Sequence, residues 1–415
     1  MSNQSELDQD FSVGNRRILL FTMGNWSHTN GALVKALHDR LPQWDINVVD
    51  LLQQFRQDKR ALLSSMIDVP VLAGQALLDR GFDRNNILYA PATSRFINRL
   101  AQQHIREYEP AFTMQTTTRF NACGGEVPHF TVIDMTVAAA RQSYRDLFHS
   151  TERALDQLDD FQREVFAGSS GVFAMGHYVR DSLVSHYDVE PHRAHTIGAG
   201  PNIVMGARSP LIGSQSILFV GTDWIRKGGP TLLKAFRKVK AKNPHAKLNI
   251  IGCSPNIDEP GVHIIGRVRR EQLHNYFTDA RVFALPTVHE AFGVAFVEAL
   301  HFGLPIVATP VGAVTEMVKN GINGHIVQPG DVYGLARALD ELLTNDEIAA
   351  GFGAASYTHA QNFTWERAAE ILHKNIFELI RRDDFSVDLA LMNSHSPSTL
   401  DRNKPALQQA PRPNA

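Results

Sequence analysis

The chain has 415 residues, of which 43% are hydrophobic and 20% charged, and its formal net charge is -2. This length favours two domains, the composition is that of a globular protein, and the charge excludes a chain-wide nucleic-acid-binding role. No run of about 18 apolar residues predicts a membrane-spanning helix. Two cysteines, Cys123 and Cys253, exclude a disulfide framework, and with an acidic, polar start they predict a cytoplasmic location.

The first half of the chain alternates short apolar runs with stretches of helical spacing. The first run leads into a loop from Gly24 to Gly31, and a helical segment and a second apolar run follow. Strand, loop, helix and strand in this order begin a doubly wound parallel sheet. A long polar stretch, 136–166, is compatible with helix. The strand candidates of this half are 16–21, 46–50, 86–89, 129–133 and 171–175.

The second half repeats this alternation after a change in composition. Glycines and prolines cluster between Gly198 and Gly213, which predicts a hinge. A helix is expected at 231–242, with Pro230 near its first turn. The strand candidates here are 216–221, 247–252, 262–266, 281–286 and 305–309. A second parallel sheet is therefore expected.

The C-terminal part combines an amphipathic helix with a polar tail. Apolar residues recur at helical spacing from Thr364, a plausible N-cap, to about Arg382. The sequence beyond is rich in Ser, Pro, Asn and Gln. The expected organisation is a flexible tail at 1–13, an N-terminal domain at 14–200, a C-terminal domain at 201–362, a helix at 363–382 and a disordered tail at 383–415.

Two glutamates form the strongest chemical signal. An apolar strand ends at Leu285, a short loop carries Glu290, and Gly293 opens a helix that contains Glu298. In an open parallel sheet such a loop lies where ligands bind, and N–H groups at a helix start attract phosphate. Two carboxylates at this place suit the hydroxyls of ribose and hexose. The alternative is that Glu290 caps the helix and Glu298 is a solvated helix residue.

A pair of cations follows the first strand of the second half. Arg226 and Lys227 stand in a loop directly before Gly228 and the helix start. Arginine can bind phosphate through two hydrogen bonds, and lysine adds a mobile charge. The spacing is not that of a Walker loop. The alternative is an ordinary surface loop.

Together these motifs resemble the retaining glycosyltransferases of family four (glycosyl transferases group 1), which have the GT-B fold. The family pattern is a strand, a loop with Arg and Lys before Gly, and later Glu-x-Phe-Gly with a second Glu eight residues after the first. This chain has Arg226-Lys227-Gly228, Glu290-Ala-Phe-Gly293 and Glu298 in that order. The resemblance extends from about Gly171 to Arg382. It implies two Rossmann-like domains facing a cleft and a C-terminal helix that crosses back to the first domain.

The resemblance also implies roles for individual residues. Arg226 and Lys227 would hold the donor diphosphate and stabilise the leaving nucleotide, Glu298 would bind the ribose hydroxyls, and Glu290 would contact the transferred sugar. Arg267 would lie beside the nucleotide base. The remaining donor contacts implied are the backbone N–H groups of Phe292, Gly293 and Val294 and, in the first loop, Gly31.

The chain departs from the family pattern at two places in its first half. The first loop, Gly24 to Gly31, lacks the usual adjacent glycines. Asp134 stands where many members have a histidine near the reacting sugar. Asp134 could accept a hydrogen bond from sugar or acceptor, which makes it a catalytic candidate beside Glu290, Arg226 and Lys227, or it could be a helix N-cap. His177 also follows a strand, and we interpret it as structural.

The predicted function is metal-independent retaining transfer of a hexose from a nucleoside diphosphate sugar, most often a UDP-sugar, to a saccharide or lipid-linked acceptor. No cofactor is expected. No metal is expected either, because the only Asp-x-Asp, Asp8-Gln9-Asp10, lies in the N-terminal tail. Two alternatives stay open: a sugar-nucleotide epimerase or hydrolase on the same scaffold, and a binding protein that has lost catalysis. Peripheral membrane contact is also left open.

Overall fold

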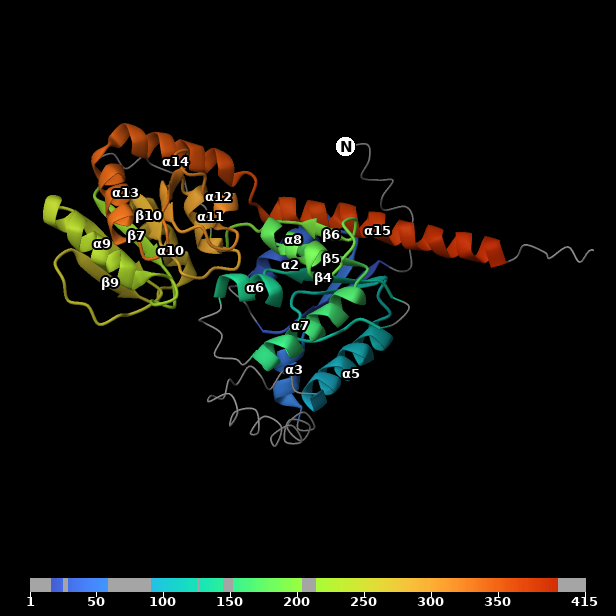
Figure 1. Cartoon of the computed structure of the whole chain (residues 1–415). Coiled ribbons are helices and arrows are strands. Elements are labelled where there is room, and N and C mark those ends of the chain that lie inside the picture. The colour runs from blue at the N-terminus through green and yellow to red at the C-terminus, as the bar shows by residue number, and fades with distance from the viewer. Residues whose placement is uncertain are drawn as a thin grey trace, which may run out of the picture.

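Two α/β domains lie side by side in the computed structural model, which describes residues 16–24, 29–58, 91–124, 127–144, 152–203 and 214–394. In Figure 1 the first domain is coloured blue to green, and the second is coloured yellow to orange. Each contains a six-stranded sheet in which every strand pairing is parallel. A parallel sheet is covered by helices on its faces, which the alternating strands and helices predict.

The first sheet has the strand order β2-β1-β3-β4-β5-β6. Its strands are β1 (Arg17–Thr22), β2 (Asp45–Asp50), β3 (Phe112–Gln115), β4 (His129–Ile133), β5 (Gly171–Ala174) and β6 (Ala194–Thr196). The order reverses at β1, so the loops after β1, β3 and β4 lie next to one another at the carboxyl edge of the sheet. The helices of this domain are α2 (Thr29–Arg40), α3 (Leu51–Gln57), α5 (Pro91–Tyr108), α6 (Val137–Tyr144), α7 (Glu152–Ala167) and α8 (His177–Ser185).

The second sheet has the strand order β12-β11-β10-β7-β8-β9. Its strands are β7 (Ser216–Val220), β8 (Lys247–Ile251), β9 (Val262–Gly266), β10 (Val282–Leu285), β11 (Ile306–Ala308) and β12 (Gly324–Ile326). The loops after β7 and β10 are neighbours in space, because these two strands pair. The helices of this domain are α9 (Gly229–Lys242), α10 (Arg270–Asp279), α11 (Val294–His301), α12 (Val314–Met317), α13 (Val332–Thr344) and α14 (Asp346–Ala360).

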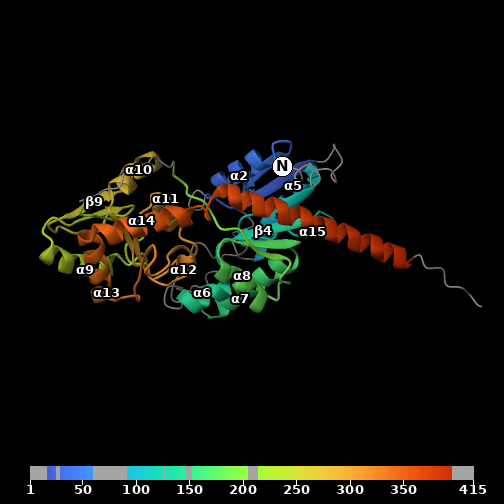
Figure 2. The same cartoon turned by 90° about the horizontal axis from the view of Figure 1, so that it is seen from above.

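The long helix α15 (Trp365–Ser394) leaves the second domain and lies across the first (Figure 2). Its Phe377 ring packs against Trp44 and Phe112 of the first domain at centroid distances of 5.4 and 6.3 Å. The Thr364 hydroxyl accepts a hydrogen bond from the Arg367 N–H at 3.1 Å, which confirms the predicted N-cap. The predicted crossover helix is therefore present.

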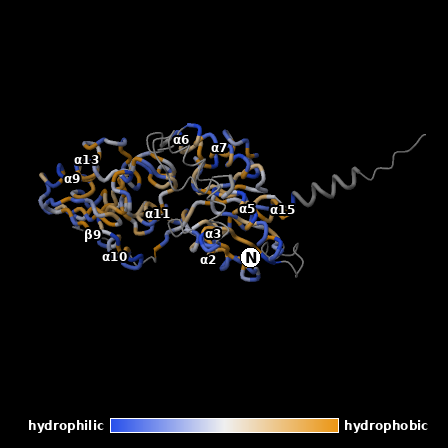
Figure 3. Tube along the Cα trace, turned by 90° about the horizontal axis from the view of Figure 1, so that it is seen from below, coloured by the Kyte–Doolittle hydropathy of each residue, from blue (hydrophilic) through white to orange (hydrophobic). Residues whose placement is uncertain are grey.

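The hydrophobic core is continuous from one domain to the other. One cluster of buried residues includes both sheets and α15, and it passes between the domains at Ala199, Phe363 and Trp365. Figure 3 shows apolar stretches concentrated inside the domains and polar ones mainly outside. No helix within the described ranges is both long and apolar enough to span a bilayer.

Three strands, β3, β6 and β12, lie where the sequence analysis predicts none. The predicted strand at 86–89 and the predicted tail at 1–13 lie outside the described residues. The helix predicted to end near Arg382 continues to Ser394. The added segment, 383–394, contains neither Gly nor Pro, so nothing in its sequence stops a helix.

Candidate functional site

A cavity of about 520 Å³ lies between the domains, at the carboxyl ends of both sheets. Its walls come from the loops after β7, β8, β9 and β10, from the start of α11, and from Thr29, Asp134 and Met175 of the first domain. This is the edge at which open α/β sheets bind ligands. Eight of the predicted site residues line it from the second domain: Arg226, Lys227, Arg267, Glu290, Phe292, Gly293, Val294 and Glu298.

The loop that carries Glu290 is held rigidly by its neighbours. The Thr287 hydroxyl donates to the His289 carbonyl at 2.7 Å, and the Thr309 hydroxyl donates to the Thr287 carbonyl. Gly312 passes so close that a Cβ there would lie 1.9 Å from the Glu290 carbonyl oxygen. The Glu290 backbone is therefore fixed before any ligand binds.

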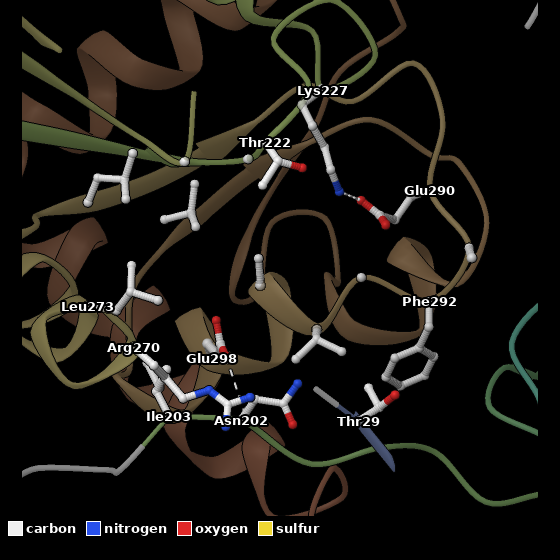
Figure 4. Close-up of a pocket in the computed structure, with 18 of the residues that line it drawn as sticks. Thr29, Asn202, Ile203, Thr222, Lys227, Arg270, Leu273, Glu290, Phe292 and Glu298 are labelled. Carbon is white, nitrogen blue, oxygen red and sulfur yellow. Dashed lines mark hydrogen bonds and ion pairs between the residues drawn. The ribbon is translucent and has the colours of Figure 1, made fainter. Parts of the chain in front are cut away.

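Glu290 and Lys227 form an ion pair inside the cavity (Figure 4). Their side chains are only 9% and 11% exposed. Burial lowers the pKa of the Lys227 ammonium, although the nearby Glu290 carboxylate opposes this. The close turn that delivers Lys227 depends on Gly228, which has φ +76° and whose added Cβ would meet the Pro286 carbonyl at 1.8 Å. The two residues to which the resemblance assigned different parts of the donor thus contact each other here.

Arg226 extends the positive charge beside this pair. Its side chain is 28% exposed, and its Nη1 donates to the His289 carbonyl at 3.1 Å. Asp223 accepts from the Arg226 N–H at 3.0 Å. Burial, together with Arg226 and Lys227, lowers the pKa of His289 to about 3, so that this imidazole stays neutral. Sequence reasoning did not identify His289.

Glu298 is buried in the middle of α11, with 6% of its surface exposed. Its carboxylate accepts a hydrogen bond from the Asn202 N–H at 3.3 Å. Burial raises the pKa of the Glu298 carboxyl to about 7, although the Asn202 N–H and the positive Arg270 oppose the rise. The alternative interpretation, a solvated helix residue, is wrong, because Glu298 is buried beside Asn202 and Arg270.

The start of α11 presents backbone N–H groups to the same cavity. Gly293 is the N-cap, has φ +97°, and contributes no side-chain hydrogen bond. The first N–H groups of a helix have no intrahelical acceptor. Phe292 is 3% exposed, and its ring lies 6.4 Å from that of Phe363. An anion in the cavity would therefore find both N–H donors and cations.

Asp134 faces the cavity from the first domain, directly after β4. It is not the cap of α6, because the Thr136 hydroxyl accepts the Ala139 N–H at 3.1 Å. The Asp134 side chain is exposed to the cleft. Desolvation by the surrounding protein raises the pKa of its carboxyl, and the nearby Glu290 carboxylate adds to the rise. Such a carboxyl is suited to hydrogen bonding with hydroxyl groups.

Two further predicted positions lie outside the cavity wall. Gly31 is exposed in the first turn of α2, and Thr29 lines the cavity from this helix instead. His177 begins α8, is exposed, and has its Nδ1 3.2 Å from the Thr196 hydroxyl. Residues 25–28 of the first loop lie outside the described residues.

Sequence reasoning missed Tyr178, Asn202 and Arg270. The Tyr178 hydroxyl, on α8 of the first domain, donates to the carbonyl of Ala291 at 2.7 Å, next to Glu290. Asn202 and Arg270 both approach Glu298. The Arg269-Arg270 pair after β9 was a visible signal, whereas nothing near Tyr178 or Asn202 in the sequence indicates Glu290 or Glu298. Among the described residues no group of three or more His, Cys, Asp or Glu could hold a metal ion.

Comparison with known proteins finds a family match in the second domain, which contributes most of the cavity wall. Residues 214–345 match the family model described as Glycosyl transferases group 1. The chain is 30% identical over 252 residues to a D-inositol 3-phosphate glycosyltransferase of Corynebacterium diphtheriae, which covers 54% of this chain and 58% of that relative. The chain thus spans little more than half the length of this curated relative.

Solved structures confirm the fold. Sucrose-phosphate synthase from Thermosynechococcus elongatus superposes with a TM-score of 0.63 at 16% identity, over 90% of this chain and 100% of that chain. HepE from Anabaena, in complex with UDP and glucose, has a TM-score of 0.59 at 14% identity, over 86% of this chain and 98% of that chain. The chain has the two-domain GT-B fold, and its predicted resemblance to the group 1 glycosyltransferases is confirmed.

Proposed function

We propose that the chain is a retaining glycosyltransferase that moves a hexose from a nucleoside diphosphate sugar to an acceptor hydroxyl, and that this donor is a UDP-sugar. The convergence of Arg226, Lys227, Glu290 and Glu298 with the start of α11 in one cavity carries this proposal. The group 1 family match supports the transferase class, and the neighbouring fold of HepE, bound to UDP and glucose, supports the choice of nucleotide.

The diphosphate would bind between the cations and the start of α11. A phosphate beside Lys227 would stabilise its ammonium against the burial that lowers its pKa. The ion pair with Glu290 would then open, and the Glu290 carboxylate would turn to the hydroxyls of the hexose. Arg226 offers a fork of donors that matches phosphate oxygens. Binding of the donor therefore replaces one charge partner of Lys227 by another.

The nucleoside would occupy the other end of the cavity. Glu298 is buried and accepts hydrogen bonds, so its carboxylate suits the two ribose hydroxyls. Arg267, which follows β9 and is exposed at the cavity wall, would lie beside the base. A hydroxyl pair that donates to Glu298 would favour its ionised form and lower its pKa on binding.

In the reaction the acceptor oxygen forms a bond to the anomeric carbon as the bond from that carbon to the diphosphate oxygen breaks. The electron pair of the broken bond leaves with the diphosphate, where Arg226, Lys227 and the α11 N–H groups stabilise the developing charge. The hydroxyl proton passes to the departing phosphate oxygen on the same face of the sugar. No enzyme nucleophile and no metal is assigned to this step.

Thermal melting with UDP, GDP, ADP and CDP, each in EDTA and in magnesium, tests the donor site. A nucleotide at about a hundred times its dissociation constant adds roughly 2.7 kcal/mol of stability. We expect one nucleotide to raise the melting temperature by several degrees in EDTA, and Lys227→Ala to abolish the rise. Lys234→Ala, an exposed lysine on α9, is the matched control. A rise that needs magnesium would contradict metal independence, and no rise with any nucleotide would contradict the proposal.

Product analysis separates transfer from the two alternatives. Glycoside formation that depends on an added acceptor supports transfer, whereas release of free sugar or an epimerised nucleotide sugar without acceptor would show hydrolase or epimerase chemistry. Unchanged turnover in Glu290→Gln would remove that carboxylate from the mechanism.

We also propose a cytoplasmic location, since neither Cys123 nor Cys253 forms a disulfide.

A further inference from the structure

The Arg270 side chain lies at the Glu298 end of the cavity, and part of its guanidinium is buried without a partner. Arg270 is the first residue of α10, and it lines the cavity together with Leu273, one turn further along the helix. Its Nη2 is buried and has no hydrogen-bond partner among the described residues. A buried donor on a charged group is costly to leave unpaired. An acceptor supplied by a ligand would remove this cost.

The packing of α10 against the end of α11 directs Arg270 and Glu298 to the same place. Phe302 directly follows α11, and its N–H donates to the Glu298 carbonyl at 3.0 Å. The Phe302 ring lies 5.3 Å from the His274 ring and is stacked on Phe277 of α10 at 5.1 Å. Arg270 and Glu298 each stand one helical turn before this contact, on their own helix. The two side chains therefore leave packed helices at matching positions.

Arg270 and Glu298 influence each other but form no ion pair. The positive charge of Arg270 favours the ionised carboxylate, since it opposes the rise that burial causes in the pKa of Glu298. Among the described residues, neither side chain takes part in an ion pair. Figure 4 shows the Arg270 side chain extending from α10 toward Asn202, whose N–H donates to Glu298. The guanidinium and the carboxylate are thus close without touching, which leaves room for a small polar group between them.

We propose that Arg270 is a second ribose-binding residue, which donates a hydrogen bond to a ribose hydroxyl that itself donates to Glu298, so that the site selects nucleotides with an intact ribose diol. This inference rests on the proposed transferase function, which places the ribose at Glu298. A hydroxyl has one donor and two acceptor lone pairs, and it can therefore satisfy a carboxylate and a guanidinium at once. A nucleotide that lacks this hydroxyl would leave the Arg270 Nη2 buried and unpaired.

A cycle that combines a residue substitution with the removal of one ligand hydroxyl tests the contact. Wild type and Arg270→Gln are titrated by calorimetry with UDP, 2′-deoxy-UDP and 3′-deoxy-UDP, or with the matching set of whichever nucleotide stabilises the protein. We expect Arg270→Gln to weaken the binding of UDP about 10- to 100-fold, the range for a hydrogen bond to a charged group. With the analogue that lacks the contacted hydroxyl, the same substitution should weaken binding by no more than about threefold.

Two further variants separate the hydrogen bond from the charge. Arg269→Gln is the matched control, because Arg269 is exposed, directly precedes α10 and is not part of the cavity wall. It removes the same charge from the same helix start, and we expect it to change the affinity for each nucleotide by less than about twofold. Arg270→Lys keeps the charge but replaces the planar fork by an ammonium. It should bind UDP more tightly than Arg270→Gln and less tightly than wild type.

Failure of this inference differs from failure of the transferase proposal. Equal weakening of all three nucleotides by Arg270→Gln would overturn the contact, because Arg270 would then act only through Glu298. No weakening of UDP binding would overturn it as well, while the donor site would stand. If no nucleotide stabilises the protein, the transferase proposal itself fails. Melting temperatures without nucleotide verify that the variants are folded, and if Arg270→Gln is not, the same comparison of the three nucleotides with Arg270→Lys decides.

Discussion

At the scale of single residues, Lys227 and Glu290 form a buried ion pair. Each of them belongs to one of the two strongest motifs in the sequence. Each charge gives up most of its hydration, and each is stabilised by the other. We expect Lys227→Met to lower the free energy of unfolding by about 1–3 kcal/mol, because the carboxylate is left without its partner. Glu290→Gln should have a similar cost, and the double variant should cost less than the sum of the two.

Urea unfolding of the four proteins in this double-mutant cycle measures the coupling directly. Lys35 and Asp39 provide the control, since this ion pair is 77% and 63% exposed on α2. Exposed pairs contribute about 0–1 kcal/mol. A coupling between Lys227 and Glu290 no larger than that between Lys35 and Asp39 would contradict the argument that burial makes the first pair strong.

Glu298 gives the protein a predictable dependence on pH. Burial raises the pKa of its carboxyl from 4.5 to about 7 in the folded state. Between these values the folded state binds more protons than the unfolded state, so stability falls as the pH rises through the window. This one group should remove about 3 kcal/mol between pH 4.5 and pH 7.

The variant Glu298→Gln isolates this contribution from all other titrating groups. We expect the stability of wild type relative to the variant to fall steadily from pH 4.5 to pH 7 in urea unfolding without nucleotide. With a nucleotide that ionises Glu298, the same comparison should become flatter. A difference between the two proteins that does not change with pH would show that Glu298 does not titrate in this window.

At the scale of elements, α8 and α12 join the domains at the edge of the site. The Glu316 carboxylate on α12 accepts the N–H groups of His177 and Tyr178 at 2.7 and 3.4 Å, and so caps α8 from the other domain. The Tyr178 hydroxyl donates to the carbonyl of Ala291, beside Glu290. Tyr178 is therefore a positioning residue for the Glu290 loop.

Replacing this hydroxyl should affect turnover more than nucleotide binding. We expect Tyr178→Phe to lower kcat about 3- to 10-fold, which corresponds to one hydrogen bond of about 0.5–1.5 kcal/mol, with little change in the dissociation constant of the nucleotide. Tyr357→Phe, at an exposed position on α14, is the control. Steady-state kinetics and nucleotide titration of both variants check this, and an equal loss of affinity in Tyr178→Phe would contradict the positioning role.

One strand that sequence reasoning missed, β3, buries polar residues. In β3, Thr113 lies beside His129 at 2.6 Å, and Gln115 bonds to the following loop. These partners satisfy the side chains, so the strand needs no apolar run. Strands β6 and β12 have three residues each, which is too short for a periodic pattern.

The same contrast applies to the site. Glu290, Glu298, Arg226 and Lys227 could be predicted, because each stands in a local motif at the end of a strand or the start of a helix. Tyr178 and Asn202 could not, because their roles arise from contacts with residues about a hundred positions away. Local spacing identifies the donor side, whereas the contacts between domains depend on the assembled fold.

At the scale of the whole molecule, the two chain segments that cross between the domains touch each other. Gly200 lies against Trp365 at the start of α15, and a Cβ at Gly200 would lie 2.5 Å from the Trp365 backbone nitrogen. The Trp365 indole N–H also donates to the Pro201 carbonyl at 3.0 Å. The next residue, Asn202, gives its N–H to Glu298. The crossing point and the proposed ribose site are thus connected by two residues of chain.

The substitution Gly200→Ala should therefore weaken nucleotide binding from outside the site. The added methyl must push the linker away from α15, and that displacement reaches the Asn202 N–H that helps to hold the Glu298 carboxylate. We expect a lower melting temperature and a dissociation constant for the nucleotide raised about 3- to 10-fold, the effect of about 0.5–1.5 kcal/mol in one hydrogen bond. Gly351→Ala on α14 is the control, since a Cβ there meets nothing within 4 Å. Gly200→Ala is not compared by stability alone, so the two readouts are separated. If it lowers the melting temperature but leaves nucleotide affinity unchanged, the crossing point supports only the packing of α15. In that case a displacement of the linker does not reach Glu298.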